Sequence, residues 1–109
     1  MSKYDPSKLS KRHRDVLMKE FSTILSSLGN SQKIRNFLRD LLTESEEVML
    51  ARRLQIAKML TSNHTYGDIR SKLKVGYENI KSVKHFLDFG WGGYLEAVNK
   101  TRKKKGKGK

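Results

Sequence analysis

The side chains best suited to recognition chemistry fall in one short segment of the chain. Tyr77, Glu78, Asn79 and Lys81 lie in the first turn of a predicted helix, and Lys84 follows one turn later. An asparagine amide can donate to and accept from adenine together, so Asn79 is the strongest candidate for reading a base edge. Glu78 could accept a hydrogen bond from a cytosine amino group, or could simply cap its own helix. The segment therefore predicts contacts to double-stranded DNA.

A second set of side chains suits the phosphate backbone. Thr65 can cap a helix whose first backbone N–H groups would position a phosphate, and Arg53 and Arg70 would add cationic contacts. The chain carries a formal net charge of +13, which favours a polyanionic partner.

The last ten residues form a basic tail that contains no acidic residue. Subtracting its seven positive charges from +13 leaves +6 on residues 1–99, so the rest of the chain is basic as well. We expect the tail, residues 100–109, to be disordered when free and to bind any phosphate backbone. Its basic residues are Lys100, Arg102, Lys103, Lys104, Lys105, Lys107 and Lys109.

Other kinds of chemistry find little support in the sequence. There is no cysteine, the three histidines are scattered, and no glycine-rich loop follows a strand pattern. Glu44, Glu46 and Glu47 cluster at a predicted helix N-terminus, where the helix dipole explains them. We expect no enzymatic activity, no cofactor and no metal. No apolar run is long enough to span a bilayer, so we also expect no membrane partner and a cytoplasmic, nucleoid-associated protein.

The elements that position the recognition residues can be predicted from apolar spacing. Two short helical patterns, Tyr66–Leu73 and Tyr77–Asp88, are separated by the three residues 74–76, the spacing of a helix-turn-helix. Val75 would fill the turn. The inner faces of the two helices would be formed by Ile69, Leu73, Ile80, Val83, Phe86 and Leu87. The alternative is an ordinary helical hairpin with solvated charges.

Residues before this motif also predict helices. Asp5-Pro6 is typical of a helix start, and apolar residues at three- and four-residue spacing continue to Gly29, which can end the helix. Ser31 can cap a second helix. Thr43 and Glu46 form a predicted capping box that opens a third helix, extending to about Ser62.

The third helix is apolar around most of its circumference, which indicates burial on most sides. A chain of 109 residues has little core with which to cover it, so we expect a homodimer. The alternative is that the first helix folds back and covers it alone. After the helix-turn-helix, Trp91 is expected to cover a core edge, and Tyr94–Asn99 to form a short last helix.

Three blocks of sequence resemble the Trp repressor superfamily over about residues 34–98. They are LLT-E-SE…L-x-R-R-L-x-I-x-K-x-L, then TYGDIRSKLKVGYENIKSVKHFL, then FGWGGY. The small Trp-repressor-like proteins that end in a similar FG-x-GGY segment are the most alike. The resemblance implies an all-α, multi-helix fold, an intertwined homodimer, and a helix-turn-helix at about residues 65–89 that binds operator-type DNA. The helical DNA-binding domain would comprise residues 1–99.

The resemblance is incomplete at the corepressor site. Arg53 matches an arginine that binds tryptophan in the Trp repressor, and Leu42 and Thr43 match the segment contributed by the other chain. Ser82-Val83, however, replaces an arginine–glycine pair of the recognition helix, so tryptophan is not expected to bind, and any small-molecule effector is unknown.

The helix-turn-helix itself also departs from the family pattern. Lys74 stands where glycine is usual, Gly76 replaces a serine cap, and Arg70 replaces a small residue. The sequence thus predicts a sequence-specific DNA-binding transcriptional regulator that does not respond to tryptophan. The alternative is a basic nucleoid- or RNA-associated protein that uses the same fold without reading sequence.

Overall fold

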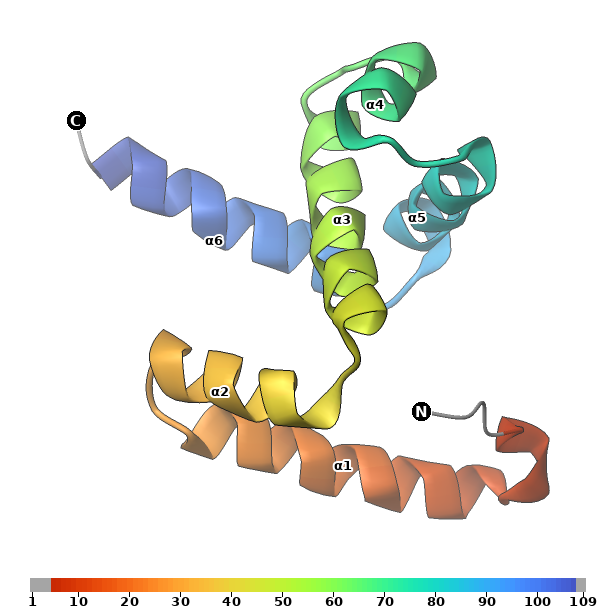
Figure 1. Ribbon diagram of the computed structural model, residues 1–109, viewed down its shortest axis with the longest axis vertical. Helices are drawn as coiled ribbons and strands as arrows, with labels where there is room; N and C mark the ends of the chain where they lie inside the picture. The colour runs from red at the N-terminus through yellow and green to blue at the C-terminus, as the bar shows by residue number, and fades with distance from the viewer. Residues whose placement is uncertain (1–4, 108–109) are drawn as a thin grey trace. The chain divides into compact units, whose positions relative to one another are not determined.

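The computed structural model describes residues 5–107, and the regular structure of that range is entirely helical (Figure 1). The predicted all-α fold is therefore confirmed. Contacts divide the chain into two compact units, Met1–Glu47 and Val48–Lys109. Within the described range, none of the helices has the length and apolarity required to cross a bilayer.

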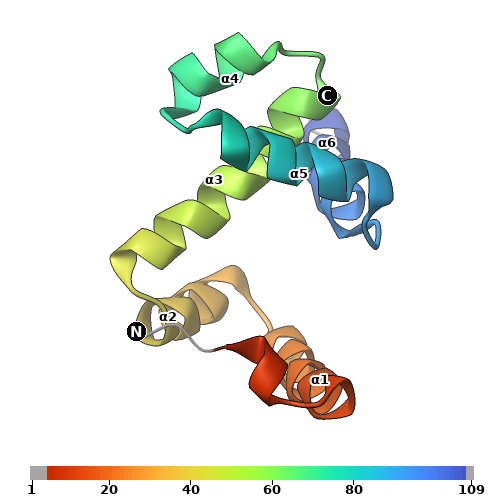
Figure 2. The same ribbon diagram turned by 90° about the vertical axis from the view of Figure 1, so that its right-hand side faces the viewer.

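The first unit contains a 3₁₀ turn, η1 (Pro6–Lys8), followed by helices α1 (Lys11–Ser27) and α2 (Ser31–Leu41). The two helices lie side by side (Figures 1 and 2), and the ring centroids of Phe21 and Phe37 are 6.1 Å apart. No residue of α1 or α2 is fully buried. The two helices thus leave much of their apolar surface open.

The start of α1 differs from the prediction. The Asp5 carboxylate does accept a hydrogen bond from the Ser7 backbone N–H at 2.9 Å, but the segment that follows is only the short turn η1. The long helix begins after Ser10, whose hydroxyl accepts from the backbone N–H of His13 at 3.1 Å. Both Asp5 and Ser10 are good caps, and a sequence pattern cannot decide between two competent caps so close together.

The junction of α1 and α2 follows the prediction except at the cap. Gly29 ends α1 with a φ of +90°, in the left-handed region that glycine enters readily. The cap of α2 is Asn30 and not Ser31, because the Asn30 side chain accepts from the Lys33 backbone N–H at 2.9 Å. Ser31 is instead the first residue of the helix.

Helix α3 (Glu44–Thr61) opens with the predicted capping box. The Thr43 backbone N–H donates to the Glu46 carboxylate at 2.8 Å, and the Glu46 backbone N–H donates to the Thr43 hydroxyl at 3.1 Å. Later in the helix Ile56 and Ala57 are fully buried, whereas Val48 and Leu50 remain 46% and 47% exposed. The first half of α3 therefore shows apolar surface that the other helices of the second unit leave uncovered.

The second unit contains the rest of α3 and the helices α4 (Tyr66–Leu73), α5 (Tyr77–Phe89) and α6 (Gly93–Lys107). All four helices contribute to one small apolar core. Its buried residues are Ile56 and Ala57 from α3, Ile69 from α4, Val75 from the turn, Ile80 and Val83 from α5, and Val98 from α6. This core fixes α4 and α5, the two helices that carry most of the candidate recognition residues.

Two aromatic residues lie elsewhere than predicted. Phe86, expected on the inner face of α5, is 52% exposed, and Trp91, expected to cover a core edge, is fully exposed. A helix turns by about 100° per residue, which places Phe86 roughly a quarter turn from the stripe of Ile80, Val83 and Leu87. Trp91 lies in the connection from α5 to α6, outside the core that the helices of the second unit share.

Helix α6 is longer than the predicted Tyr94–Asn99, because regular helical backbone continues to Lys107. Residues 100–107, which the sequence assigned to a disordered tail, are helical in this structure. Lysine and arginine favour the helix almost as strongly as alanine does, and the disorder expected of the free tail stays a prediction. Val98, near the start of α6, is its buried core residue.

Candidate nucleic-acid interface

Helices α4 and α5 form the predicted helix-turn-helix, with the predicted start of each helix and a three-residue turn between them. Lys74 ends α4 in the left-handed conformation, with φ 57° and ψ 45°. Val75 then inserts into the core, where it is only 8% exposed, and Gly76 leads into α5. A left-handed lysine costs roughly 1 kcal/mol or more, so the turn is made despite an unfavourable residue.

The outer face of α5 carries most of the candidate base-reading side chains. Tyr77, Glu78 and Lys81 are exposed, and Asn79 is half-buried. Ile80 and Val83 point the opposite way, into the core. The arrangement leaves polar groups of the first helical turn accessible to a ligand, with Asn79 the least accessible of them.

The two α5 lysines in the candidate set have carboxylate neighbours on their own helix. Lys81 Nζ lies 3.6 Å from a Glu78 carboxylate oxygen, and Lys84 Nζ lies 3.4 Å from Asp88 Oδ1. Exposed pairs of this kind stabilise a protein by about 0–1 kcal/mol. Both lysines can therefore exchange their carboxylate for a phosphate at small cost.

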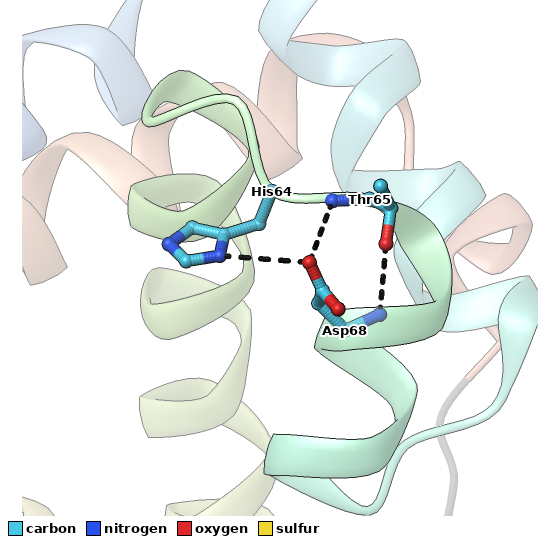
Figure 3. Close-up of polar contacts among 3 residues, drawn as sticks. All are labelled: His64, Thr65 and Asp68. Atoms are coloured by element: carbon cyan, nitrogen blue, oxygen red, sulfur yellow. Dashed lines mark hydrogen bonds and ion pairs between the residues drawn. The ribbon is translucent and has the colours of Figure 1, made fainter.

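The N-terminus of α4 is closed by a reciprocal capping box (Figure 3). The Asp68 backbone N–H donates to the Thr65 hydroxyl at 3.0 Å, and the Thr65 backbone N–H donates to the Asp68 carboxylate at 3.4 Å. His64 Nδ1 is 3.9 Å from the same carboxylate. Thr65 thus caps as predicted, and its hydroxyl still has its own O–H to donate.

The role of Asp68 was missed from the sequence, although Thr-x-x-Asp is a capping pattern that could have revealed it. Its carboxylate takes up the Thr65 N–H, one of the donors assigned to a phosphate, and adds a negative charge beside the helix N-terminus. The α4 N-terminus is for this reason a weaker phosphate site than the sequence suggested.

Two arginines were assigned to phosphate contacts, and the structure gives them different surroundings. Arg53 is an exposed residue of α3. Arg70 is exposed as well, but its Cζ lies 4.5 Å from the centre of the Tyr77 ring. Tyr77 in turn has its ring centre 6.3 Å from that of Tyr66. The structure therefore brings Arg70 and Tyr77 together across the turn, which the sequence did not predict.

Within residues 5–107, the remaining candidate residues lie on α5 and α6. Lys100 is exposed on α6, while the side chains of the remaining tail residues, 102–109, lie outside the described part of the chain. At the position of the corepressor arginine–glycine pair, Ser82 is exposed and Val83 is a core residue, 2% exposed. Among the described residues, no group of histidine and carboxylate side chains is arranged to hold a metal ion.

Comparison with known proteins places the chain in the Trp repressor family. A family profile described as "Trp repressor protein" matches residues 17–102. The uncharacterised protein YerC of Bacillus subtilis is 33% identical over 82 residues, which cover 75% of this chain and 78% of YerC. The crystal structure of a provisionally assigned Trp repressor from Staphylococcus aureus superimposes with a TM-score of 0.72 at 30% identity. That match covers 92% of this chain and 96% of the other.

Proposed function

The chain belongs to the Trp repressor family, and from this we propose that it is a sequence-specific DNA-binding transcriptional regulator that acts as a homodimer. Helix α5 is the recognition helix in this proposal and enters the major groove. Asn79 and Lys81 contact base edges, while Arg53, Arg70 and Lys84 contact phosphates.

The observation that carries the proposal is the geometry of α4 and α5. Their three-residue turn, with Val75 buried, and the core contacts of Ile69 and Ile80 fix the second helix while its first turn remains exposed. This is the arrangement in which a helix-turn-helix presents side chains to the major groove. The formal net charge of +13 supports a polyanionic partner.

Selection of bound fragments from a pool of random duplex DNA tests the proposal. A common sequence should emerge, and two half-sites separated by about one helical turn are expected for a dimer. Replacing Asn79 or Lys81 with alanine should then cost roughly 1–3 kcal/mol on the selected site, with little change on random duplex. Lys33→Ala, an exposed lysine of α2, is the control for loss of one charge.

The second candidate function is non-specific binding to nucleoid DNA or to RNA. The seven basic residues after Asn99 favour it, because such a segment binds any phosphate backbone through counterion release. If selection yields no common sequence, and Asn79→Ala weakens binding to all duplexes equally, this second function is the better account.

We also propose that tryptophan is not the corepressor. Val83 takes the place of the glycine that lets an indole approach the helix backbone, and its side chain is part of the core. At the position where the Trp repressor has an arginine before that glycine, this chain has Ser82, which supplies no cation. Calorimetric titration with millimolar tryptophan should give no saturable heat, whereas a micromolar dissociation constant would contradict the proposal.

A further inference from the structure

The contact between Arg70 and Tyr77 joins the two helices of the helix-turn-helix. Arg70 is in the last turn of α4, and Tyr77 is the first residue of α5. The 4.5 Å between the Arg70 Cζ and the Tyr77 ring centre is within the range of a cation–π interaction. Tyr66, four residues before Arg70 on the same face of α4, also contacts the Tyr77 ring. Tyr77 therefore packs on α4 and is only 46% exposed.

Arg70 differs from the lysines of α5 in what it contacts. Lys81 and Lys84 each lie beside a carboxylate, whereas Arg70 has no ion pair and no side-chain hydrogen bond within the described residues. An attraction to a ring face uses no hydrogen-bond acceptor, so the guanidinium N–H groups remain available. Arg70 is thus held in place by a group that does not neutralise it.

The position of Arg70 indicates which ligand this cation suits. It lies beside the start of α5, where Gly76 makes no side-chain capping hydrogen bond. The first backbone N–H groups of a helix carry partial positive charge and attract phosphate. The Arg70 guanidinium lies over the ring of the first residue of α5, and a guanidinium can bind a phosphate through two parallel N–H donors.

We propose that Tyr77 is a positioning residue and not a base reader. Its ring holds the Arg70 guanidinium beside the N-terminus of α5, ready to bind a phosphate of the DNA backbone. Holding the side chain in place before binding reduces the entropy lost when the complex forms. The inference rests on the proposed binding of DNA but not on sequence specificity, because a phosphate is present at every site.

Substitutions at Tyr77 separate the two roles. Tyr77→Phe keeps the ring and removes only the hydroxyl, so affinity for both selected and random duplex should stay unchanged. Tyr77→Leu removes the ring, and should weaken binding to both duplexes about 2- to 5-fold, the loss expected from an exposed cation–π contact. If Tyr77→Phe weakens the selected duplex and leaves random duplex unchanged, then Tyr77 reads bases and the inference is wrong.

Substitutions at Arg70 test whether Tyr77 acts through the guanidinium. Arg70→Gln should lower the log–log salt slope by about 0.9, the value for one phosphate that is no longer neutralised. In the Arg70→Gln background Tyr77→Leu should have no further effect on DNA affinity. An equal loss of affinity in both backgrounds would overturn the inference. Arg39→Gln, an exposed arginine of α2, controls for the removal of one positive charge.

Arg70→Lys provides a test that stays valid even if Tyr77→Leu destabilises the fold. This variant should fold normally, because Arg70 is exposed and lysine is also a good helix former. Lysine keeps the charge but lacks the planar fork, so this variant should bind both duplexes more weakly than wild type. Affinity equal to wild type would show that the planar fork is not needed and would overturn the two-donor contact to the phosphate. Thermal unfolding of each variant without DNA confirms that it is folded.

Failure of the inference can be distinguished from failure of the proposed function. A wild-type chain that binds no duplex at low salt would overturn both. A wild-type chain that binds duplex DNA, together with independent effects of Arg70 and Tyr77, would overturn only the inference.

Discussion

The carboxylates of the helix-turn-helix each lie beside a lysine or a hydrogen-bond donor of their own chain. Asp68 caps α4 and lies 3.9 Å from His64 Nδ1, while Glu78 and Asp88 lie near lysines of α5. Repulsion between these carboxylates and DNA phosphates is consequently reduced. A surface that carries acidic residues can in this way still bind a polyanion.

Glu46 gives a prediction about pH. The Thr43 backbone N–H donates to its carboxylate and lowers the pKa of Glu46 below the ordinary value of 4.5. A lowered pKa in the folded state means that the charged carboxylate stabilises the fold above the ordinary pKa. This contribution disappears as the pH falls through the folded pKa. Wild type should therefore be more stable than Glu46→Gln near neutral pH, and the difference should shrink on acidification.

Thermal unfolding of both proteins from about pH 6 to about pH 3, the range of carboxylate titration, measures this difference. Glu44→Gln removes a charge from the same helical turn without removing the capping hydrogen bond, and is the control. Parallel curves for wild type and Glu46→Gln across the whole range would contradict the prediction.

At the scale of elements, the chain reverses sharply after α5. The Gly90 backbone N–H donates to the Phe86 carbonyl at 3.0 Å, and a Cβ added at Gly90 would overlap that same carbonyl oxygen. Gly90→Ala should therefore destabilise the protein by about 1–3 kcal/mol, the usual cost of overpacking. Denaturant unfolding measures the change.

Gly93 provides the matched control for Gly90, because a Cβ at Gly93 would meet no atom within 4 Å. Since Gly93 is the first residue of α6, alanine there should be neutral or slightly stabilising. Equal stabilities of the two alanine variants would show that the end of α5 can shift without cost, and would contradict the prediction.

The elements were predictable where a cap and an apolar period agreed. The start and end of α4 were predictable from the cap residue Thr65, the apolar Ile69 and the three-residue spacing at Lys74–Gly76. The structure has the cap and the turn at these positions and buries Ile69. The start of α1 was not predictable, since Asp5 and Ser10 are both competent caps. The Arg70–Tyr77 contact was not predictable either, because it depends on how two helices meet in space. The prediction that Trp91 covers a core edge was wrong, because it followed the usual burial of aromatic residues and Trp91 is fully exposed.

At the scale of the whole molecule, uncovered apolar surface leads us to expect a homodimer. Neither α1 nor α2 has a fully buried residue, and Val48 and Leu50 of α3 are about half exposed. Association with a second copy would cover such surface. Sedimentation in moderate salt should give about twice the chain mass of 12.6 kDa. A monomer at concentrations of tens of micromolar would argue against the dimer.

The basic residues after Asn99 should contribute to affinity without contributing to specificity. Replacing all seven with glutamine lowers the net charge from +13 to +6, and glutamine is itself a good helix former. Binding to selected and random duplexes should weaken by the same factor. The log–log salt slope should fall by about 0.9 for each phosphate that these residues neutralise in the wild-type complex. An effect confined to the selected duplex would mean that this segment takes part in sequence reading.

The exposure of Trp91 makes the chain its own optical reporter. It is the only tryptophan of the chain, and it lies between α5 and α6 with its side chain fully exposed. All indole fluorescence consequently comes from one position, and a collisional quencher in the solvent can reach it. A shift of the emission to shorter wavelength, or protection from quenching, would report that this corner becomes covered. Titration with a second copy or with a duplex can thus be followed without any attached label.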